Sequence, residues 1–338
     1  MDERPPVRIV VVGASAGGVE ALQRFVAALP AALAVPIVVV LHVSPTGVSV
    51  LPQILSRAGR LPARHASDGE RLEPGHVYVA PPDHHVRLQD GHIRLVRGPR
   101  ENGHRPAVDP LFRTAAASFG PAAAGVILSG ALDDGTIGLA AIKQAGGTTL
   151  VQDPEEALYP SMPRSAIERV GVDHVAPIAE LARLVVERVT PEPGRVDGVE
   201  QREGEAVEPQ QEHEIEPVGN PVGEVAAFTC PECNGTLWEV PEGGLVTLRC
   251  RVGHAYTEEA YEANKSEALE AALWTALQTL EEKADFARRL AARAAAAGNN
   301  RIAGCHEEQR RRTLRQGDLV REALAGLTVE PVDERQVS

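Results

Sequence analysis

The stretch VRIVVVGASAGG, residues 7–18, decides the fold of this chain of 338 residues. Its first half is a continuous β-branched run, which is typical of a strand buried on both faces of a parallel sheet. Its second half fits the pattern G-x-S-x-G around Ser15, which places a serine on a tight turn between a strand and a helix. A helix is expected next, over residues 19–28. The sequence therefore predicts an α/β domain whose first loop presents a candidate nucleophile.

The same alternation of apolar strands and Ala-rich helical stretches continues to about residue 190. Further buried strands are expected at residues 36–42, 125–130 and 148–152, and a further helix at 178–189. Between them, residues 76–96 alternate in polarity and contain Asp90-Gly91, which indicates an antiparallel hairpin. Strands separated by helices predict a doubly wound, mostly parallel sheet covered on both faces, with this hairpin as an antiparallel excursion.

Composition excludes several classes of function. The net charge of −13 argues against a nucleic-acid partner, which would favour a basic surface. The N-terminus lacks the basic start and apolar run of a signal peptide. No apolar run approaches the roughly 20 residues needed to span a bilayer. We therefore expect a soluble, cytoplasmic protein without membrane insertion.

Polar residues follow the strands at the edge where the loop with Ser15 is expected. His42 ends the second strand, and Asp133 and Asp134 follow the third. In a doubly wound sheet the carboxyl ends of the strands form the ligand-binding edge. A histidine there could take the serine proton, and a carboxylate could orient the imidazole.

Each of these features has a plainer interpretation. The glycine-rich turn could be a dinucleotide loop, but Ser15 takes the middle glycine position and His42 stands where a ribose-binding acid is expected. His42 could be structural, and the Asp-Gly pair favours an Asx turn or a helix N-cap. The residue types alone leave the choice between Asp133 and Asp134 open, although neighbouring side chains are expected to point in different directions.

The last third of the chain has a different composition. Residues 191–226 are rich in Glu, Gln, Pro and Gly, which predicts a flexible acidic linker that uncouples the C-terminal part of the chain from the first domain. In residues 227–256, two strands and a turn lie between CxxC and CxxxH, and thiolates with an imidazole suit tetrahedral zinc. The candidate zinc ligands of this zinc-ribbon-like unit are Cys230, Cys233, Cys250 and His254. In the alternative, these cysteines are small apolar residues.

A helical hairpin is expected over residues 257–327, before a tail at 328–338. Its break is Gly298-Asn299-Asn300, and its first helix carries an apolar stripe of Leu269, Leu273, Leu277 and Leu280. The stripe either packs the two helices together or binds a partner. Cys305 is isolated on the second helix and is expected to serve packing, not metal binding.

Several motifs of the first 190 residues occur in the order seen in the chemotaxis protein-glutamate methylesterase (CheB-type) catalytic domain, which this part of the chain resembles. They are GASAGG (13–18), the strand ending in His42, DGERLEPGHVYVAPPDHHV (68–86), HRPAVDPLF (104–112), GVILSGALDDG (125–135), QAGG (144–147) and MPRSAI (162–167). The resemblance implies a serine hydrolase with the triad Ser15, His42 and Asp134, because the acid of the family directly precedes a glycine. It also implies oxyanion or substrate contacts near Ala16, Gly17, Gly18 and Ala131.

The resemblance further implies hydrolysis of protein glutamate γ-methyl esters on a methyl-accepting chemoreceptor or another methylated signalling protein, with glutamine deamidation as a related reaction. No cofactor is expected for catalysis. The sequence departs from the family at Ala16, usually Thr, and at GALDDG (130–135), usually GMGxDG. Control by the receiver domain usual in the family is not expected, since six residues precede the first strand. The alternatives are a non-catalytic signalling adaptor and an esterase with another substrate.

Overall fold

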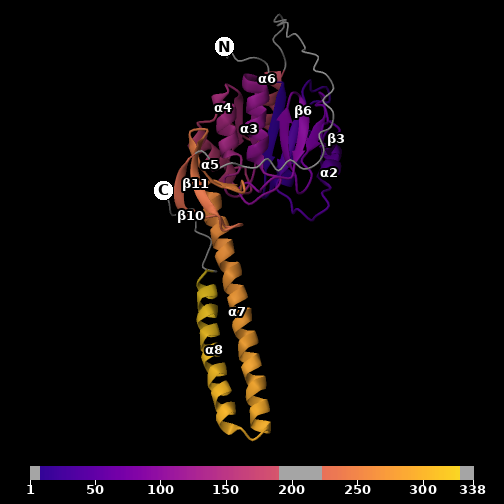
Figure 1. Cartoon of the computed structure of the whole chain (residues 1–338). Helices are drawn as coiled ribbons and strands as arrows, with labels where there is room; N and C mark the ends of the chain where they lie inside the picture. The colour runs from indigo at the N-terminus through magenta and orange to yellow at the C-terminus, as the bar shows by residue number, and fades with distance from the viewer. Residues whose placement is uncertain (1–7, 190–222, 328–338) are drawn as a thin grey trace, which may run out of the picture. The chain divides into compact units, whose positions relative to one another are not determined.

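The computed structural model describes residues 8–189 and 223–327 (Figure 1). Most of the expected linker and all of the expected tail lie outside these residues. The chain divides into two compact units, Met1–Tyr261 and Glu262–Ser338, and each is described by itself.

A parallel sheet of seven strands forms the centre of the first unit, in the order β3-β4-β2-β1-β7-β8-β9. Every neighbouring pair in it is parallel. The strands are β1 (Ile9–Ala14), β2 (Ile37–Leu41), β3 (Ala63–His65), β4 (Val77–Val79), β7 (Ala123–Ile127), β8 (Thr148–Gln152) and β9 (His174–Ala176). This confirms the doubly wound α/β fold.

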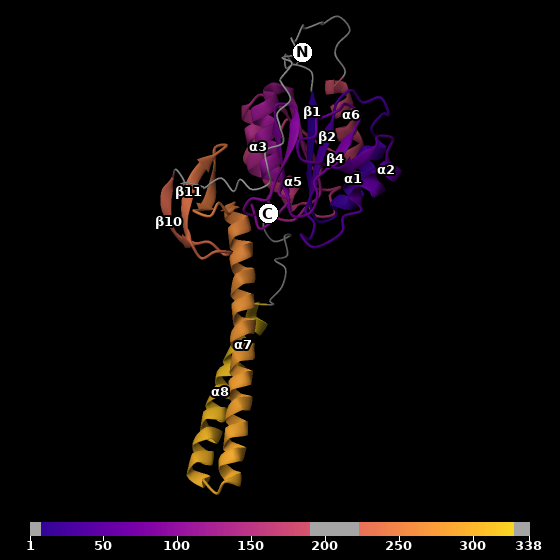
Figure 2. The same ribbon diagram turned by 45° about the vertical axis from the view of Figure 1, so that its right-hand side comes forward.

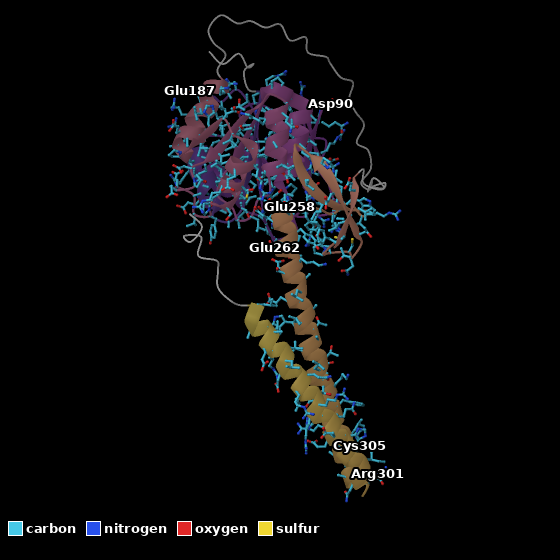
Figure 3. All side chains as sticks on the ribbon, turned by 90° about the vertical axis from the view of Figure 1, so that its left-hand side faces the viewer. Asp90, Glu187, Glu258, Glu262, Arg301 and Cys305 are labelled. Atoms are coloured by element: carbon cyan, nitrogen blue, oxygen red, sulfur yellow. The ribbon has the colours of Figure 1, made fainter. Side chains whose placement is uncertain are left out.

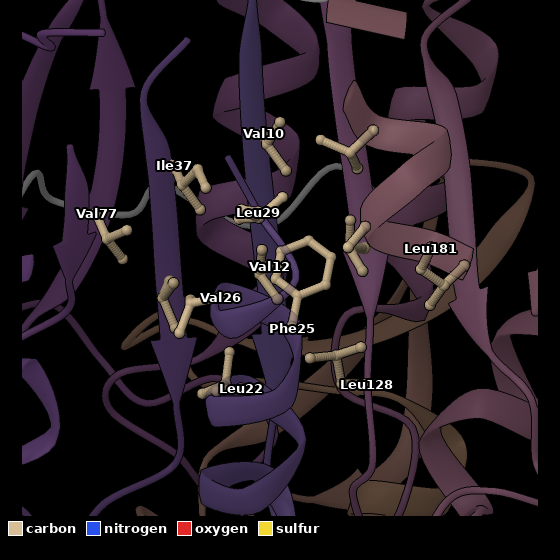
Figure 4. Close-up of a cluster of buried hydrophobic side chains, with 14 of the residues drawn as sticks. Val10, Val12, Leu22, Phe25, Val26, Leu29, Ile37, Val77, Leu128 and Leu181 are labelled. Atoms are coloured by element: carbon tan, nitrogen blue, oxygen red, sulfur yellow. The ribbon is translucent and has the colours of Figure 1, made fainter. Parts of the chain in front are cut away.

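Helices cover both faces of this sheet, because its strands are apolar on both sides (Figure 2). On one face, Phe25 and Leu22 of a helix pack against Val10 and Val12 of β1 (Figure 4). The helices of this face are α1 (Gly18–Ala27), α2 (Leu51–Ala58) and α6 (Ile178–Val189). The helices of the other face are α3 (Val108–Phe119), α4 (Thr136–Gln144) and α5 (Ser161–Val170), and a short 3-10 turn (Gly120–Ala122) follows α3.

The expected hairpin is confirmed in part. β5 (His85–Gln89) and β6 (His92–Val96) pair antiparallel across the Asp90-Gly91 turn. Val77–Val79, which were expected to belong to this excursion, instead form β4 and pair parallel with β2. The reason is burial: all three residues of β4, Val-Tyr-Val, are buried, as is typical of a strand inside a parallel sheet.

The Cys-containing unit is a sheet of four antiparallel strands, where two were expected. They are β10 (Glu224–Thr229), β11 (Thr236–Glu242), β12 (Leu245–Cys250) and β13 (Ala255–Tyr256). The expectation that this unit is uncoupled from the catalytic domain is wrong. Arg113 of α3 pairs with Glu242 of β11 at 3.1 Å, and the turn at Gly243 lies against the Ile137 carbonyl of α4.

Two long helices, α7 (Glu258–Ala296) and α8 (Asn300–Leu327), confirm the expected hairpin, and the second unit begins within α7. Leu277 of the expected stripe is buried and lies against Gly317 of α8, whereas Leu269 is 51% exposed. Cys305, near the turn between the helices, is exposed, so its expected packing role is wrong (Figure 3). None of the helices in the described residues is both long and apolar enough to cross a membrane.

Candidate active site

The strand order creates a topological switch point at the carboxyl ends of β1 and β7. These strands are neighbours, but the chain leaves β1 through α1 on one face and β7 through α4 on the other. Ligands bind at such switch points in open α/β sheets. Ser15 directly follows β1, His42 directly follows β2, and Asp134 lies in the loop after β7. The sheet therefore brings the three predicted side chains to one edge.

The side chains of Ser15, His42 and Asp134 form a continuous hydrogen-bonded series. His42 Nδ1 lies 2.9 Å from Ser15 Oγ, and His42 Nε2 lies 2.7 Å from Asp134 Oδ2. The His42 side chain is 7% exposed. An ionised carboxylate accepts only, so the neutral imidazole carries its proton on Nε2 and leaves Nδ1 free to accept the serine proton.

Asp134 is held by donors from several segments. Its Oδ2 also accepts from the Val108 N–H at 2.6 Å, and its Oδ1 accepts from the Asp109 N–H at 3.3 Å and from Asn102 Nδ2 at 2.9 Å. The two backbone donors belong to the first turn of α3, where the helix dipole favours an anion. Burial opposes the charge, but the bonds from His42 and Val108 outweigh it and hold the pKa of Asp134 well below its usual value.

Asp133 points away from His42, as expected for a neighbouring position. Its Oδ1 accepts a 2.6 Å hydrogen bond from Thr257 Oγ1, and its Oδ2 lies 3.4 Å from Arg169 Nη1. Burial raises the pKa of Asp133 to about 6, against the opposing effect of the Thr257 hydrogen bond. The hydrogen bonds therefore distinguish the two carboxyl groups: Asp134 contacts His42, whereas Asp133 contacts Thr257 and Arg169.

Three further residues complete the surroundings of the site. The ring of His104 stacks on His42, with centroids 3.7 Å apart. Asn102 Nδ2 contacts both Asp134 and Asp109, and burial together with the Asp134 charge raises the pKa of Asp109 well above its usual value. His104 and Asp109 stand in the HRPAVDPLF stretch, so that motif could have pointed to them. Asn102 had no such signal.

The loop after β1 needs glycines, because its backbone adopts a positive φ and packs closely against the loop after β7. Gly17 has φ 69°, and a side chain at Gly130 would lie 1.9 Å from Met162 Sδ and 3.0 Å from Ser15 Cβ. Of the predicted oxyanion residues, Gly18 donates its N–H to the Ser15 carbonyl at 2.8 Å. The N–H groups of Ala16, Gly17 and Ala131 have no acceptor within residues 8–189 and 223–327, so they are free to bind a substrate oxygen.

Leu132 carries backbone strain in the loop that bears the two aspartates. Its φ is 59°, a left-handed conformation that is unfavourable for a residue with a Cβ atom such as leucine. In the family pattern GMGxDG this position is a glycine, which adopts such a φ without cost. Leucine at this position therefore stores strain next to Asp133.

The lowered pKa of His104 makes the free energy of unfolding depend on pH. Burial, and then the neighbouring His42, lower this pKa from the ordinary 6.5 to about 4. Between these values the unfolded chain binds more protons than the folded one, so stability rises with pH and is lost as the pH falls. Acidification from about pH 7 to about pH 5 is expected to cost the wild type about 2 kcal/mol more than His104→Gln.

Scanning calorimetry of both proteins at the two pH values measures this difference. For a domain of this size it corresponds to roughly 4–8 °C in the unfolding midpoint. His306→Gln on α8 is the matched control, and it should follow the wild type. An equal loss in wild type and His104→Gln would contradict the assignment.

The four predicted metal ligands lie together in the Cys-containing unit. Their ligand atoms are all within 4.8 Å of one another. His254 Nδ1 is 3.6 Å from Cys230 Sγ and 3.5 Å from Cys250 Sγ, and Cys233 Sγ is 3.6 Å from Cys250 Sγ. The other ring nitrogen of His254 lies 3.2 Å from Glu232 Oε2. These residues form a cluster that could hold a metal ion.

Comparison with known proteins agrees with the resemblance inferred from the motifs. Residues 10–185 match the family model of the CheB methylesterase. A protein-glutamate methylesterase/protein-glutamine glutaminase 1 of Geobacter metallireducens is 40% identical over 180 residues, which are 52% of this chain and 49% of that protein. A putative enzyme of the same name from Leptospira interrogans is 38% identical over 178 residues, 52% of this chain and 92% of that protein.

The fold agrees as well. The crystal structure of the Thermotoga maritima CheB methylesterase catalytic domain superposes with a TM-score of 0.52 at 36% identity, covering 54% of this chain and 98% of that one. The chain thus spans about half the length of the Geobacter relative and nearly all of the solved catalytic domain. The family match ends before the Cys-containing unit. By its residues 10–185, this chain belongs to the CheB methylesterase family.

Proposed function

We propose that the chain is a serine hydrolase that cleaves glutamate γ-methyl esters on a methylated signalling protein and releases methanol. The observation that carries this proposal is the series of hydrogen bonds from Ser15 through His42 to Asp134, in a chain of the CheB methylesterase family. A methyl-accepting chemoreceptor is the proposed partner. Deamidation of a receptor glutamine is a related acyl transfer that the same groups can perform.

In the proposed mechanism, Ser15 Oγ attacks the ester carbonyl carbon while its proton passes to His42 Nδ1. The tetrahedral intermediate collapses, the bond from carbon to methoxy oxygen breaks, and His42 returns the proton to the leaving group as methanol. A water molecule then attacks the acyl-enzyme, with His42 again as base, and Ser15 and a glutamate carboxylate are released. Asp134 stabilises the imidazolium through Nε2 in both halves.

The oxyanion of the intermediate requires donors next to Ser15. We assign this role to the free N–H groups of Ala16, Gly17 and Ala131, at the start of α1 and in the loop after β7. Preorganised backbone donors of this kind stabilise the developing charge without any reorganisation during the reaction. A backbone donor at Ala131 is compatible with the loss of the methionine usual in the family at that position. The Gly18 N–H is excluded because the Ser15 carbonyl already accepts it.

A methanol-release assay tests the proposed function. The full-length chain is incubated with a receptor cytoplasmic fragment that carries labelled methyl esters, and volatile label is counted. We expect release by the wild type and none by Ser15→Ala. Turnover of p-nitrophenyl acetate without methanol release would point to another ester substrate. Absence of any turnover that depends on Ser15 would favour the adaptor alternative.

We further propose that Cys230, Cys233, Cys250 and His254 hold one structural zinc ion. Tetrahedral zinc with Zn–S bonds of about 2.3 Å separates its ligand atoms by roughly 3.5–3.8 Å, and the three distances within the cluster support this. Glu232 beside His254 supplies the carboxylate that commonly orients a zinc-bound histidine. The four-residue ligand set is closed, so the metal supplies folding free energy and no catalytic water.

Elemental analysis of the purified full-length chain, expressed with zinc available, checks this site. We expect about one zinc per chain in the wild type and a large loss in Cys233→Ser, because a tetrahedral site with three ligands binds far more weakly. Cys305→Ser removes a cysteine outside the cluster and should keep the metal. A zinc content near zero in well-folded wild type would refute the proposal.

A further inference from the structure

Asn102 joins the Cys-containing unit to the catalytic domain. Its backbone N–H donates to the Ala255 carbonyl at 2.8 Å, and its side-chain Oδ1 accepts from the Thr257 N–H at 2.9 Å. Asn102 is 4% exposed, and Thr257 is 2% exposed. The contact between Asn102 and Thr257 is therefore buried in the interior of the first unit.

The amide nitrogen of Asn102 points the other way, into the candidate active site. Nδ2 donates to Asp134 Oδ1 at 2.9 Å and to Asp109 Oδ2 at 3.0 Å. With Thr257 bound to Oδ1, both hydrogens of Nδ2 and the amide oxygen have partners from three separate segments. Because the oxygen is fixed by Thr257, the amide cannot turn over without losing the donor that it gives to Asp134.

A second set of contacts supports the same junction. Thr257 Oγ1 donates to Asp133 Oδ1 at 2.6 Å and accepts from the Ala260 N–H at 3.1 Å, so it caps α7 and binds the loop after β7 at once. Arg113 of α3 bridges Glu101 at 2.6 Å and Glu242 at 3.1 Å. The segments that carry Asp134 and its helix-terminal donors are thus both tied to the Cys-containing unit.

The junction begins immediately after the metal-ligand cluster. His254 precedes Ala255, and the turn that ends at His254 is closed by a 3.0 Å hydrogen bond from the Cys250 N–H to the His254 carbonyl. The hydrophobic centre of the small sheet consists of few side chains, among them Cys230 and Cys250 themselves. A unit of this size needs a staple to hold its shape, so the positions of Ala255 and Thr257 depend on the cluster.

We propose that the Cys-containing unit, stapled by a metal ion at Cys230, Cys233, Cys250 and His254, holds the catalytic acid in place through Asn102. The path runs from His254 through Thr257 to Asn102, then to Asp134 and His42. Asn102 is a positioning residue, since it touches Asp134 and not the reacting atoms. This inference rests on the proposed hydrolase function, and it makes esterase activity depend on a metal that takes no part in the chemistry.

The expected effect falls on turnover and not on substrate binding. Without its staple, the segment around Thr257 releases Asn102 Oδ1, and the amide no longer holds Asp134 Oδ1. The carboxylate keeps its bonds to the Val108 and Asp109 N–H groups, but Oδ1 loses its shorter bond, so the orientation of Oδ2 toward His42 Nε2 is less well fixed. Misplacement of a catalytic group by about 1 Å lowers rates on the order of a hundredfold, so we expect kcat to fall by roughly ten- to a hundredfold with KM nearly unchanged.

Full-length protein and p-nitrophenyl acetate provide the test. Zinc content, kcat and KM are measured for the wild type as loaded with zinc, after chelation, and after zinc is restored. Chelation should lower kcat and restored zinc should recover it. Cys233→Ser should behave like the chelated wild type, and Cys305→Ser, the matched cysteine outside the cluster, like the loaded wild type.

Asn102→Gly separates positioning from general stability. Glycine accepts the φ of 52° at this position, so the variant removes the amide and keeps the backbone. Its kcat should be low with zinc bound, and chelation should lower it no further, because both changes break the same path. A zinc effect of equal size in wild type and Asn102→Gly would overturn the role of Asn102.

Two other results would also decide the matter. A chelated wild type that is folded by circular dichroism and keeps full, Ser15-dependent kcat would overturn the inference and leave the hydrolase standing. If the zinc-loaded wild type neither turns over the ester nor is labelled at Ser15 by a fluorophosphonate, the hydrolase itself fails. The inference then falls with it.

Discussion

Ser15→Ala is expected to lower ester turnover by at least about 10³-fold while the fold stays intact. The reason for the loss is the role of Oγ, which lies 2.9 Å from His42 Nδ1 and would be the attacking atom. The reason for the intact fold is that Ser15 anchors its loop through the backbone. Its N–H donates to the Ser129 carbonyl at 3.0 Å, and its carbonyl accepts from the Gly18 N–H. Alanine keeps both bonds.

Steady-state turnover of p-nitrophenyl acetate and the thermal midpoint, measured on the same preparations, check this expectation. Ser44→Ala, at an exposed serine hydrogen-bonded to Thr46, is the matched control and should keep full turnover. His42→Ala should be comparably severe, because the members of such a triad act as a unit. Full activity in a folded Ser15→Ala protein would show that the proposed nucleophile is wrong.

The elements nearest to Ser15 were predictable because their sequences carry local signals. A short continuous apolar run such as residues 37–41 indicates a buried strand in an α/β chain. Because parallel strands end at the same edge of the sheet, Ser15 and His42 are brought to that edge in any strand order. Some boundaries moved: the strand expected at residues 125–130 is β7 (Ala123–Ile127), and residues 77–79 form β4 of the parallel sheet and not part of the hairpin. Asp134 was preferred over Asp133 by the family motif, and the distances from His42 now favour the same residue.

The partners of Asp134 were not predictable from local pattern. Asn102 lies in a short turn without periodicity, and its importance comes from contacts with Thr257, 155 positions away in the sequence. The docking of the Cys-containing unit was missed for the same reason. The composition of residues 191–226 predicts a flexible linker, but it does not predict which contacts the folded segment after the linker makes with the first domain. Such contacts depend on buried polar groups that find each other in three dimensions.

Asp134→Asn should lower turnover on the order of 10²–10⁴-fold, whereas Asp133→Asn should lower it by less than about threefold. The same substitution at adjacent positions makes each variant the control of the other. Around Asp134, Oδ2 accepts from His42 and the Val108 N–H, and Oδ1 accepts from Asn102 and the Asp109 N–H. Whichever way an asparagine amide turns, its NH₂ group meets two donors, so His42 loses either its partner or its fixed orientation.

Asp133 tolerates the change for a physical reason. Its oxygens meet Thr257 and Arg169 and not His42, so a side chain of the same shape at this position leaves the orientation of His42 unchanged. The asparagine oxygen can still accept from Thr257 Oγ1, which keeps the junction with the Cys-containing unit. Side-by-side kcat and KM values on one ester decide between the two positions. If Asp133→Asn were the more damaging variant, Asp133 and not Asp134 would be the acid that orients His42. The proposed connection from the Cys-containing unit to the nucleophile would then run through Thr257 and Asp133 and not through Asn102.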